Sequence, residues 1–168
     1  MKKFGLLLGV FLILTGLTFW DNGLTDIYER TPGARVCFYV TADESLNLGG
    51  FSQDVLIIRS GAGIIIEAPG AAAAELRQGF SKIRGESVSF CGNYADAQEI
   101  IRFYRVQTVK KEILPSGNTG KSITIIYGFS KLLTKSVNLD GEKVNIQIAV
   151  NGATGRVTAG TPLILGSY

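Results

Sequence analysis

The sequence predicts an α+β domain with a largely antiparallel sheet and about two helices packed on one face. Strand-like runs of β-branched and aromatic residues, separated by Gly, Asn, Asp and Pro, occupy most of the chain. These runs do not alternate with helical segments as a doubly wound parallel sheet requires, which favours the antiparallel class. The chain has 168 residues, of which 46% are apolar and 18% charged, so one domain is expected and a wholly disordered chain is excluded.

The first twenty residues predict membrane targeting. A basic start, Met1-Lys2-Lys3, precedes 17 residues without a charge, residues 4–20. Ionisable groups are costly in hydrocarbon and lysines favour the cytoplasmic side, so the segment is interpreted as a signal anchor or a signal peptide. The missing Ala-x-Ala site favours the uncleaved anchor, and a buried N-terminal helix is the alternative. The rest of the chain is therefore expected to be extracytoplasmic, anchored to the cytoplasmic membrane or secreted.

Residues 21–34 are polar and are expected to form a linker to a single α+β domain at residues 35–168. The first predicted strand of this domain is residues 35–41. Two apolar runs within residues 55–66 flank a Gly-rich turn, and this spacing is typical of a hairpin.

Residues 71–83 are predicted to be the first helix because four consecutive Ala have high helix propensity. Leu76, Phe80 and Ile83 recur at helical spacing and give the helix one apolar face. Gly85 is expected to end it, since glycine tolerates the left-handed geometry of a helix C-terminus.

The second predicted helix follows a strand at residues 87–91. Asn93 is a good N-cap, and Asp96 lies in the first turn, where the helix dipole favours a carboxylate. The chain is expected to change from helix to strand near Arg105.

The C-terminal third is predicted to consist of strands. A turn cluster at 115–120 and the dipeptide Asp140-Gly141 mark two connections between them. In residues 144–150 apolar and polar residues alternate, so this part of the sheet is expected to be covered on one face only. Each half of the domain carries a hairpin and a helix, which hints at a duplicated arrangement. The expected strands are residues 109–114, 123–127, 137–139, 144–150 and 156–165, the last with a break near residues 160–162.

Cys37 and Cys91 both lie in strand-like runs. Two adjacent strands would bring the thiols within bonding distance, and a disulfide would persist outside the cell. The alternative is a pair of free thiols that behave as small apolar groups. The sequence leaves both readings open.

The chain contains no histidine, which excludes several kinds of catalytic and metal-binding site. Ser-His and Cys-His mechanisms and His-ligated metals are excluded, and two cysteines cannot build a four-thiolate zinc site. Residues 117–122 resemble the end of a phosphate-binding loop. However, Pro115 stands where the first glycine is required, and a strand-like run follows instead of a helix. No cofactor and no metal are expected.

Catalysis by a pair of carboxylates and catalysis by a Ser-Lys pair both have weak support in the sequence. The acid pairs Asp43-Glu44 and Asp140/Glu142 fall in predicted turns, and the neighbouring residues of Ser81-Lys82 or Ser130-Lys131 do not face each other on a helix. No catalytic residue is assigned. A cell-envelope hydrolase that uses carboxylate or Ser-Lys chemistry is nevertheless the alternative to a binding protein, because these residue types are present.

Basic residues concentrate in the middle of the chain, where residues 77–111 contain seven basic and three acidic side chains. Such a surface would suit anionic lipid, an anionic envelope polymer or nucleic acid. The alternative is a solvated helix face that balances the acidic residues upstream. The extracytoplasmic location and the lack of interleaved aromatic residues weigh against nucleic acid. The candidate residues are Arg77, Lys82, Arg84, Arg102, Arg105, Lys110 and Lys111.

The C-terminal half resembles the YwmB-like family of small exported proteins from Gram-positive bacteria. The order of four pieces carries the resemblance: residues 123–133, 137–149, 157–164 and the terminal Tyr168. The resemblance implies an α+β fold likened to that of the TATA-box-binding protein, and it implies no established activity and no site residues.

The sequence as a whole favours a non-catalytic binding or interaction domain that faces the cell envelope. The expected partner is an envelope protein or an anionic envelope polymer, with membrane contact through residues 4–20. The hydrolase is the alternative, and a nucleic-acid-binding domain by fold analogy is the weaker one.

Overall fold

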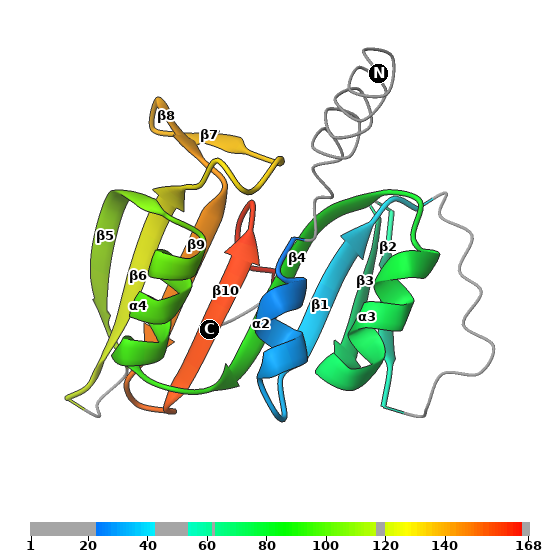
Figure 1. Ribbon diagram of the computed structural model, residues 1–168, viewed down its shortest axis with the longest axis horizontal. Coiled ribbons are helices and arrows are strands. Elements are labelled where there is room, and N and C mark those ends of the chain that lie inside the picture. The colour runs from blue at the N-terminus through cyan, green and yellow to red at the C-terminus, as the bar shows by residue number, and fades with distance from the viewer. Residues whose placement is uncertain (1–22, 43–53, 62, 117–119, 166–168) are drawn as a thin grey trace, which may run out of the picture.

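The computed structural model describes residues 23–42, 54–61, 63–116 and 120–165. This part of the chain forms an eight-stranded antiparallel sheet, a separate two-stranded hairpin and three helices (Figure 1). The predicted α+β class with a largely antiparallel sheet is confirmed. The predicted anchor lies outside the described residues, and no helix within them is long and apolar enough to cross a membrane.

The large sheet has the strand order β2-β3-β1-β4-β10-β9-β6-β5, and its two halves meet where β4 pairs with β10. The helices are α2 (Thr25–Arg30), α3 (Gly70–Gly79) and α4 (Tyr94–Phe103). The strands of the first half are β1 (Arg35–Val40), β2 (Leu56–Ser60), β3 (Gly63–Pro69) and β4 (Ile83–Cys91). Those of the second half are β5 (Gln107–Pro115), β6 (Ser122–Phe129), β9 (Ile146–Asn151) and β10 (Arg156–Thr161). The small hairpin consists of β7 (Val137–Leu139) and β8 (Glu142–Val144).

The two halves of the sheet have equal strand numbers but different connectivity. From its edge to the β4–β10 junction, the second half follows chain order, whereas the first half runs β2, β3, β1, β4. In addition, α3 precedes the last strand of its half and α4 precedes the first strand of the other. The hinted duplication therefore does not extend to a common connectivity.

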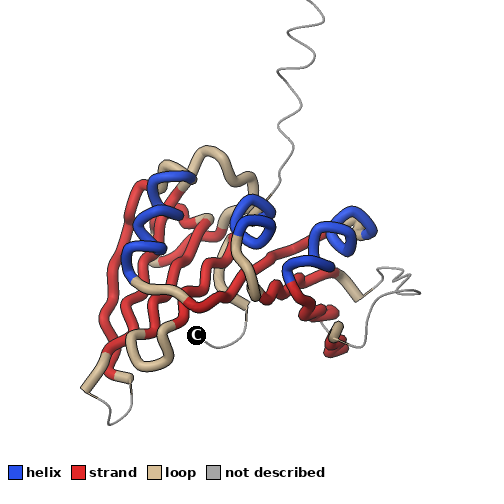
Figure 2. Tube along the Cα trace, turned by 60° about the horizontal axis from the view of Figure 1, so that its bottom comes forward, coloured by secondary structure: helices blue, strands red, loops and turns tan. Residues whose placement is uncertain are grey.

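The helices all lie on one face of the large sheet, which leaves the other face open (Figure 2). The main core fills the space between the two layers and includes Val36, Phe38, Ile148 and Val157, each 0% exposed. Side chains alternate between the faces of a strand, so the neighbours of these residues point to the open face. The open face therefore carries polar and apolar side chains.

The segment expected to be a linker belongs to the fold. α2 occupies its middle, and Leu24, Ile27 and Tyr28 are buried in the main core. Their apolar side chains are spaced so that they share one face of a short helix, and this face meets the sheet. Burying these side chains stabilises the fold more than a solvated linker would. The expected boundary at residue 35 is therefore wrong, because the described fold already includes residues 23–34.

The first predicted helix is confirmed, but its expected end is wrong. α3 ends at Gly79, and Gly85 lies inside β4, where its backbone pairs with Tyr39 of β1. Ile83 belongs to the same strand, where it is the partner of Val40 of β1, so its backbone is paired in the sheet and not in a further helical turn.

The second predicted helix is confirmed with its capping residues. The Asn93 side chain accepts from the Ala95 amide at 2.8 Å, and the Asp96 carboxylate accepts from the Asn93 amide at 2.7 Å. This capping box stabilises the start of α4. The helix ends at Phe103, and Arg105 takes a positive φ of 50° before β5 begins.

The expectation that residues 144–150 are covered on one face only is wrong. Every residue of β9 is buried, including Gln147. On the open face, the segment after β10 lies over this region: the Ile164 amide donates to Gln147 Oε1 at 3.0 Å, and a side chain at Gly160 would collide with Ile164. The chain end therefore covers part of the face that the sequence pattern left exposed.

The remaining predicted strands are present, although some have different bounds. The strand expected at residues 156–165 ends at Thr161, and the one expected at 144–150 is divided between β8 and β9. The hairpin β2–β3 and the hairpin β7–β8, with its Asp140-Gly141 turn, are both present. β5 extends from Gln107 to Pro115 and so includes the strand expected at residues 109–114.

Candidate functional site

A polar pocket of about 470 Å³ lies on the open face, toward the end of the sheet where β1 and β10 begin. The strand register assembles it: Arg35 is the partner of Ser89, and Ser89 is the partner of Thr158. Because partners on adjacent antiparallel strands share a face, these side chains form a row across three strands. The lining residues are Arg35, Cys37, Glu67, Ser87, Ser89, Asn151, Thr154, Arg156, Thr158 and Leu165.

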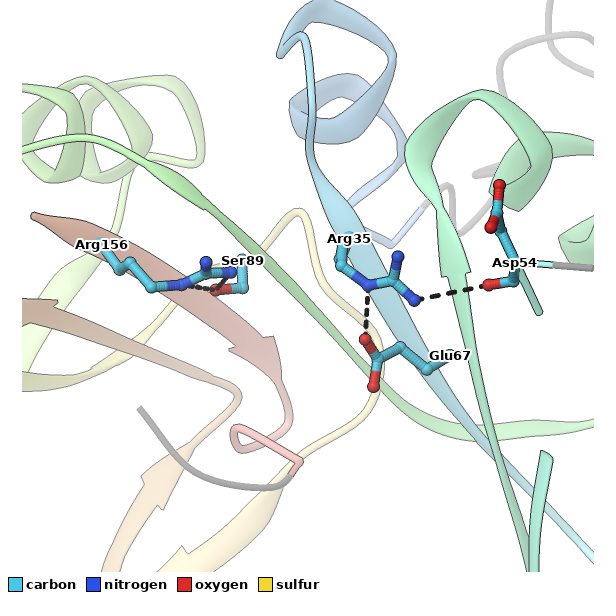
Figure 3. A network of polar contacts seen from close by, with 5 residues as sticks. All are labelled: Arg35, Asp54, Glu67, Ser89 and Arg156. Atoms are coloured by element: carbon cyan, nitrogen blue, oxygen red, sulfur yellow. Dashed lines mark hydrogen bonds and ion pairs between the residues drawn. The ribbon is translucent and has the colours of Figure 1, made fainter. Parts of the chain in front are cut away.

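Arg156 of this pocket is held by the Ser89 hydroxyl (Figure 3). Its Nε and Nη2 atoms donate to Ser89 Oγ at 3.2 and 2.9 Å, and Ser89 Oγ also lies 3.1 Å from Thr158 Oγ1. Within the described part of the chain, no carboxylate lies within ion-pair distance of Arg156. The positive charge is thus oriented but not neutralised.

Arg35, the second arginine of the pocket, is neutralised. Its Nε atom lies 2.5 Å from Glu67 Oε1, and its Nη2 atom is 3.4 Å from the backbone oxygen of Asp54 (Figure 3). Both side chains of the ion pair are partly exposed, at 41% and 32%. The pocket therefore offers one arginine committed to an acid and one available to a ligand.

The floor between the two arginines is neutral. Ser87 donates from Oγ to the Leu165 backbone oxygen at 3.3 Å, which joins the chain end to the pocket wall. Asn151 Oδ1 accepts from the Ala153 and Thr154 amides at 3.0 and 3.2 Å and so fixes the β9–β10 turn at the rim. Burial raises the pKa of the Cys37 thiol, and the nearby Glu67 carboxylate raises it further.

Cys37 and Cys91 are free thiols in the structure and do not form the disulfide that was the other possibility. Cys37 is the partner of Ser87, so Cys91 lies four positions further along β4. That separation is about 13 Å along a strand, whereas a disulfide needs Cα atoms within about 7 Å. The sequence pattern identified both strands correctly but could not give their register.

The seven basic residues do not form one surface. Arg77 on α3 makes an ion pair with the buried Glu86. It also lines a surface hollow of about 410 Å³ together with Lys82 and Lys135. Arg84 is two positions from Lys82 and is exposed. This subset gathers at the end of the sheet where β4 begins.

The other predicted basic residues lie over the second half of the sheet. Lys110 pairs with Glu112 at 2.9 Å and with Asp140 at 3.3 Å. These two ion-pair partners raise the pKa of the Lys110 ammonium group. Lys111 contacts the ring of Tyr94 at 5.1 Å. Arg102 lies beside Glu99 on α4, and Arg105 follows that helix.

The residues considered for catalysis occupy structural positions where they are described. Asp140 and Glu142 flank the tip of the β7–β8 hairpin. Ser130 is fully buried and its Oγ donates to the Tyr104 backbone oxygen. Asp43 and Glu44 lie outside the described residues.

The loop that resembles a phosphate-binding motif is followed by a strand. Residues 117–119 lie outside the described residues, but Ser122 begins β6. A phosphate loop requires a helix there. Among the described residues, no three potential ligands from His, Cys, Asp and Glu lie close enough to hold a metal.

A larger groove of about 590 Å³ lies between α2 and α4. Its floor is apolar, and the Arg30 guanidinium lies 5.7 Å from the Phe103 ring centre. Its charged rim is internally paired, with Arg30 3.5 Å from Asp26. The open-face pocket is therefore the better candidate, because Arg156 has no acidic partner in the described part of the chain.

Comparison of the chain with family models, with curated proteins and with solved structures finds no match.

The central residue of the site, Arg156, was not among the sequence candidates. Arg156 and Ser89 are 67 positions apart, so no local spacing relates them. The available signal was alternation, because Arg156-Val157-Thr158 places two polar side chains on one face of a strand. That signal shows an open polar face but not which strand lies next to it.

Proposed function

We propose that this domain is a non-catalytic binding module that faces the cell envelope and takes an acidic, polar ligand on the open face of its sheet. The observation that carries the proposal is the Arg156–Ser89 contact, in which a guanidinium is oriented by one hydroxyl and has no carboxylate partner in the described part of the chain. A carboxylate or phosphate group is the chemistry that complements such an arginine.

The pocket supports this ligand class energetically. A guanidinium has five N–H donors, of which Arg156 directs one Nε and one Nη2 hydrogen to the same Ser89 oxygen. An arriving oxyanion would exchange these neutral contacts for charge-assisted hydrogen bonds, which are about twice as strong. The hydroxyls of Ser89 and Thr158 then remain to donate to the same ligand.

The cellular setting of the proposal comes from the sequence. The basic start and the apolar residues 4–20 support an anchor that leaves the domain outside the cytoplasmic membrane. The C-terminal resemblance to the YwmB-like family, whose members are exported, supports the same setting. The partner is then an envelope protein with an acidic segment or an anionic envelope polymer.

Titration calorimetry at low salt tests the proposal, with the full chain in detergent and two probes: inorganic phosphate and polygalacturonate, a carboxylate polymer. Arg156→Ala is expected to weaken binding of at least one probe about tenfold or more, since a hydrogen bond to a charged group contributes about 1.5–3 kcal/mol.

The matched control is Lys121→Ala, which removes a basic residue just before β6, outside the pocket lining. It is expected to retain the wild-type affinity. Equal affinity of wild-type protein and Arg156→Ala for both probes, or no binding of either, would show that this pocket is not the anion site.

A further inference from the structure

We infer that the domain contacts an anionic bilayer through one end of its sheet, the end at which the chain enters the fold. The inference rests on the membrane anchor of the proposed function and adds a second contact that the anchor does not require. We define the anchor-proximal surface as the exposed or half-exposed residues Lys82, Arg84, Lys131, Leu132 and Lys135.

The entrance of the chain into the fold is fixed by polar contacts. The Leu24 amide donates to the buried Glu86 carboxylate, and the Tyr104 hydroxyl donates to the Gly23 backbone oxygen at 3.0 Å. Gly23 has a φ of +53°, and a Cβ atom there would overlap the Glu86 carboxylate. The point from which the anchor departs is therefore held in one place on the domain.

The anchor is too close to this point for the domain to stand away from the bilayer. Only three peptide steps separate Trp20, the last residue of the apolar run, from Gly23. Three residues span at most about 11 Å even when fully extended. The surface that surrounds Gly23 must consequently lie near the lipid headgroups.

The strand register places the anchor-proximal surface around that point. Glu86, which binds the Leu24 amide, is near the start of β4 and is the partner of Thr161 at the end of β10. On the next strands, Gly160 is the partner of Gln147, and Gln147 is the partner of Tyr127 near the end of β6. The segments that precede β4 and follow β6 therefore emerge at one end of the sheet (Figure 1).

The charge of these two segments suits an anionic surface. Residues 79–85 and 130–136 contain four basic and no acidic residues. The hollow of about 410 Å³ lies among them, with Arg77, Lys82 and Lys135 in its lining and with Ser81 as a hydroxyl. Arg77 is committed to Glu86, and the two lysines supply the charge suited to lipid phosphate groups.

An apolar residue accompanies the basic ones. Leu132 is 45% exposed although its neighbour Leu133 is buried in the core. Lysines flanking an exposed leucine are typical of segments that lie at a membrane surface. This contact would also orient the domain, because β1 and β10 begin at the opposite end of the sheet and carry Arg35 and Arg156 there. The open-face pocket is then presented away from the membrane.

The test compares the full chain in vesicles of pure phosphatidylcholine with the chain in vesicles that also contain phosphatidylglycerol. Flotation measures membrane association, and amide hydrogen exchange by mass spectrometry measures local protection. In the anionic vesicles, peptides covering residues 79–85 and 130–136 are expected to exchange several-fold more slowly than in phosphatidylcholine. The turn at residues 152–155 should be unchanged.

Two double variants make the test specific. Lys82→Glu with Lys131→Glu is expected to abolish the added protection, because it reverses two charges of the anchor-proximal surface. Arg30→Glu with Lys121→Glu reverses two charges at the opposite end and is expected to retain it. Circular dichroism and thermal melts confirm that both variants fold.

The outcomes separate the inference from the proposed function. Flotation with equal exchange in both vesicle types, or equal loss of protection in both variants, would overturn the inference alone. A chain that does not float would overturn the membrane location and this inference together. The effect of Arg156→Ala on ligand binding is independent of either result.

Discussion

On the face of the sheet that the helices cover, the Glu86 carboxylate is fully buried and is bonded to the Arg77 guanidinium and the Leu24 amide. On the open face, Arg156 is exposed and is bonded to the Ser89 hydroxyl. The first charge is satisfied by partners from two other parts of the fold, whereas the second has no acidic partner in the described part of the chain. The comparison separates a buried ion pair that maintains the structure from an exposed arginine that is available for binding.

The largest effect that tests this comparison is expected from Glu86→Ala. The substitution leaves Arg77, whose side chain is 14% exposed, without its acid and should cost about 3–5 kcal/mol of stability. Urea unfolding followed by circular dichroism measures the change. Combining it with Arg77→Met should recover part of the loss, because the double variant has no unpaired buried charge. A loss of less than about 1 kcal/mol for Glu86→Ala would contradict a structural role.

A smaller loss is expected from Asn145→Ala. The Asn145 amide group donates to the Ser130 and Leu133 backbone oxygens at 2.6 and 2.9 Å and accepts from the Ser130 amide at 2.7 Å. Its removal takes these partners from the Ser130 amide and the Leu133 oxygen, while the Ser130 oxygen still accepts from the Leu133 amide at 3.4 Å. The loss should cost about 2–3 kcal/mol. The control is Asn138→Ala on β7, where the side chain is exposed and the expected change is within about 0.5 kcal/mol. Equal stability of the two variants would refute the prediction.

On the open face, a substitution next to Cys37 is expected to change the reactivity of that thiol instead of the stability of the fold. Burial and the Glu67 carboxylate raise the pKa of Cys37, so the fraction of reactive thiolate at a given pH is below the usual one and alkylation is slow. Glu67→Gln removes the negative charge and leaves Arg35 to favour the thiolate, so the Cys37 pKa should fall and iodoacetamide should react faster at the same pH. Mass spectrometry of the Cys37 peptide measures the rate, and the exposed Cys91 is the internal reference. An unchanged ratio of the two rates would contradict this explanation.

Local signals in the sequence were sufficient where a structural element depends on near neighbours. Asn93 and Asp96 lie three positions apart and build the cap of α4 by themselves. Asp140 and Gly141 both take positive φ, which the hairpin turn requires and which Asp-Gly supplies. Neither feature needs information from the rest of the chain.

Sequence patterns gave the wrong structure where a residue's conformation depends on which strand pairs with it. Ile83 and Gly85 continue a helical pattern, but pairing with β1 makes them part of β4. Leu24, Ile27 and Tyr28 stand among polar residues, and only the core that they enter shows why they form α2. The candidate pocket was missed for the same reason, because its row of side chains is created by register.

The junction of β4 and β10 has a consequence for how the chain folds. Contacts across this junction join distant parts of the chain: Ser89 and Arg156, for example, are 67 positions apart, whereas β5 and β6 are joined by a short connection. Closing long loops costs entropy before the contacts form, so each half of the sheet is expected to assemble before the junction closes. The open-face pocket spans the junction, so it exists only once both halves have docked. Ligand binding therefore reports the completed fold and cannot be retained by a half-folded chain.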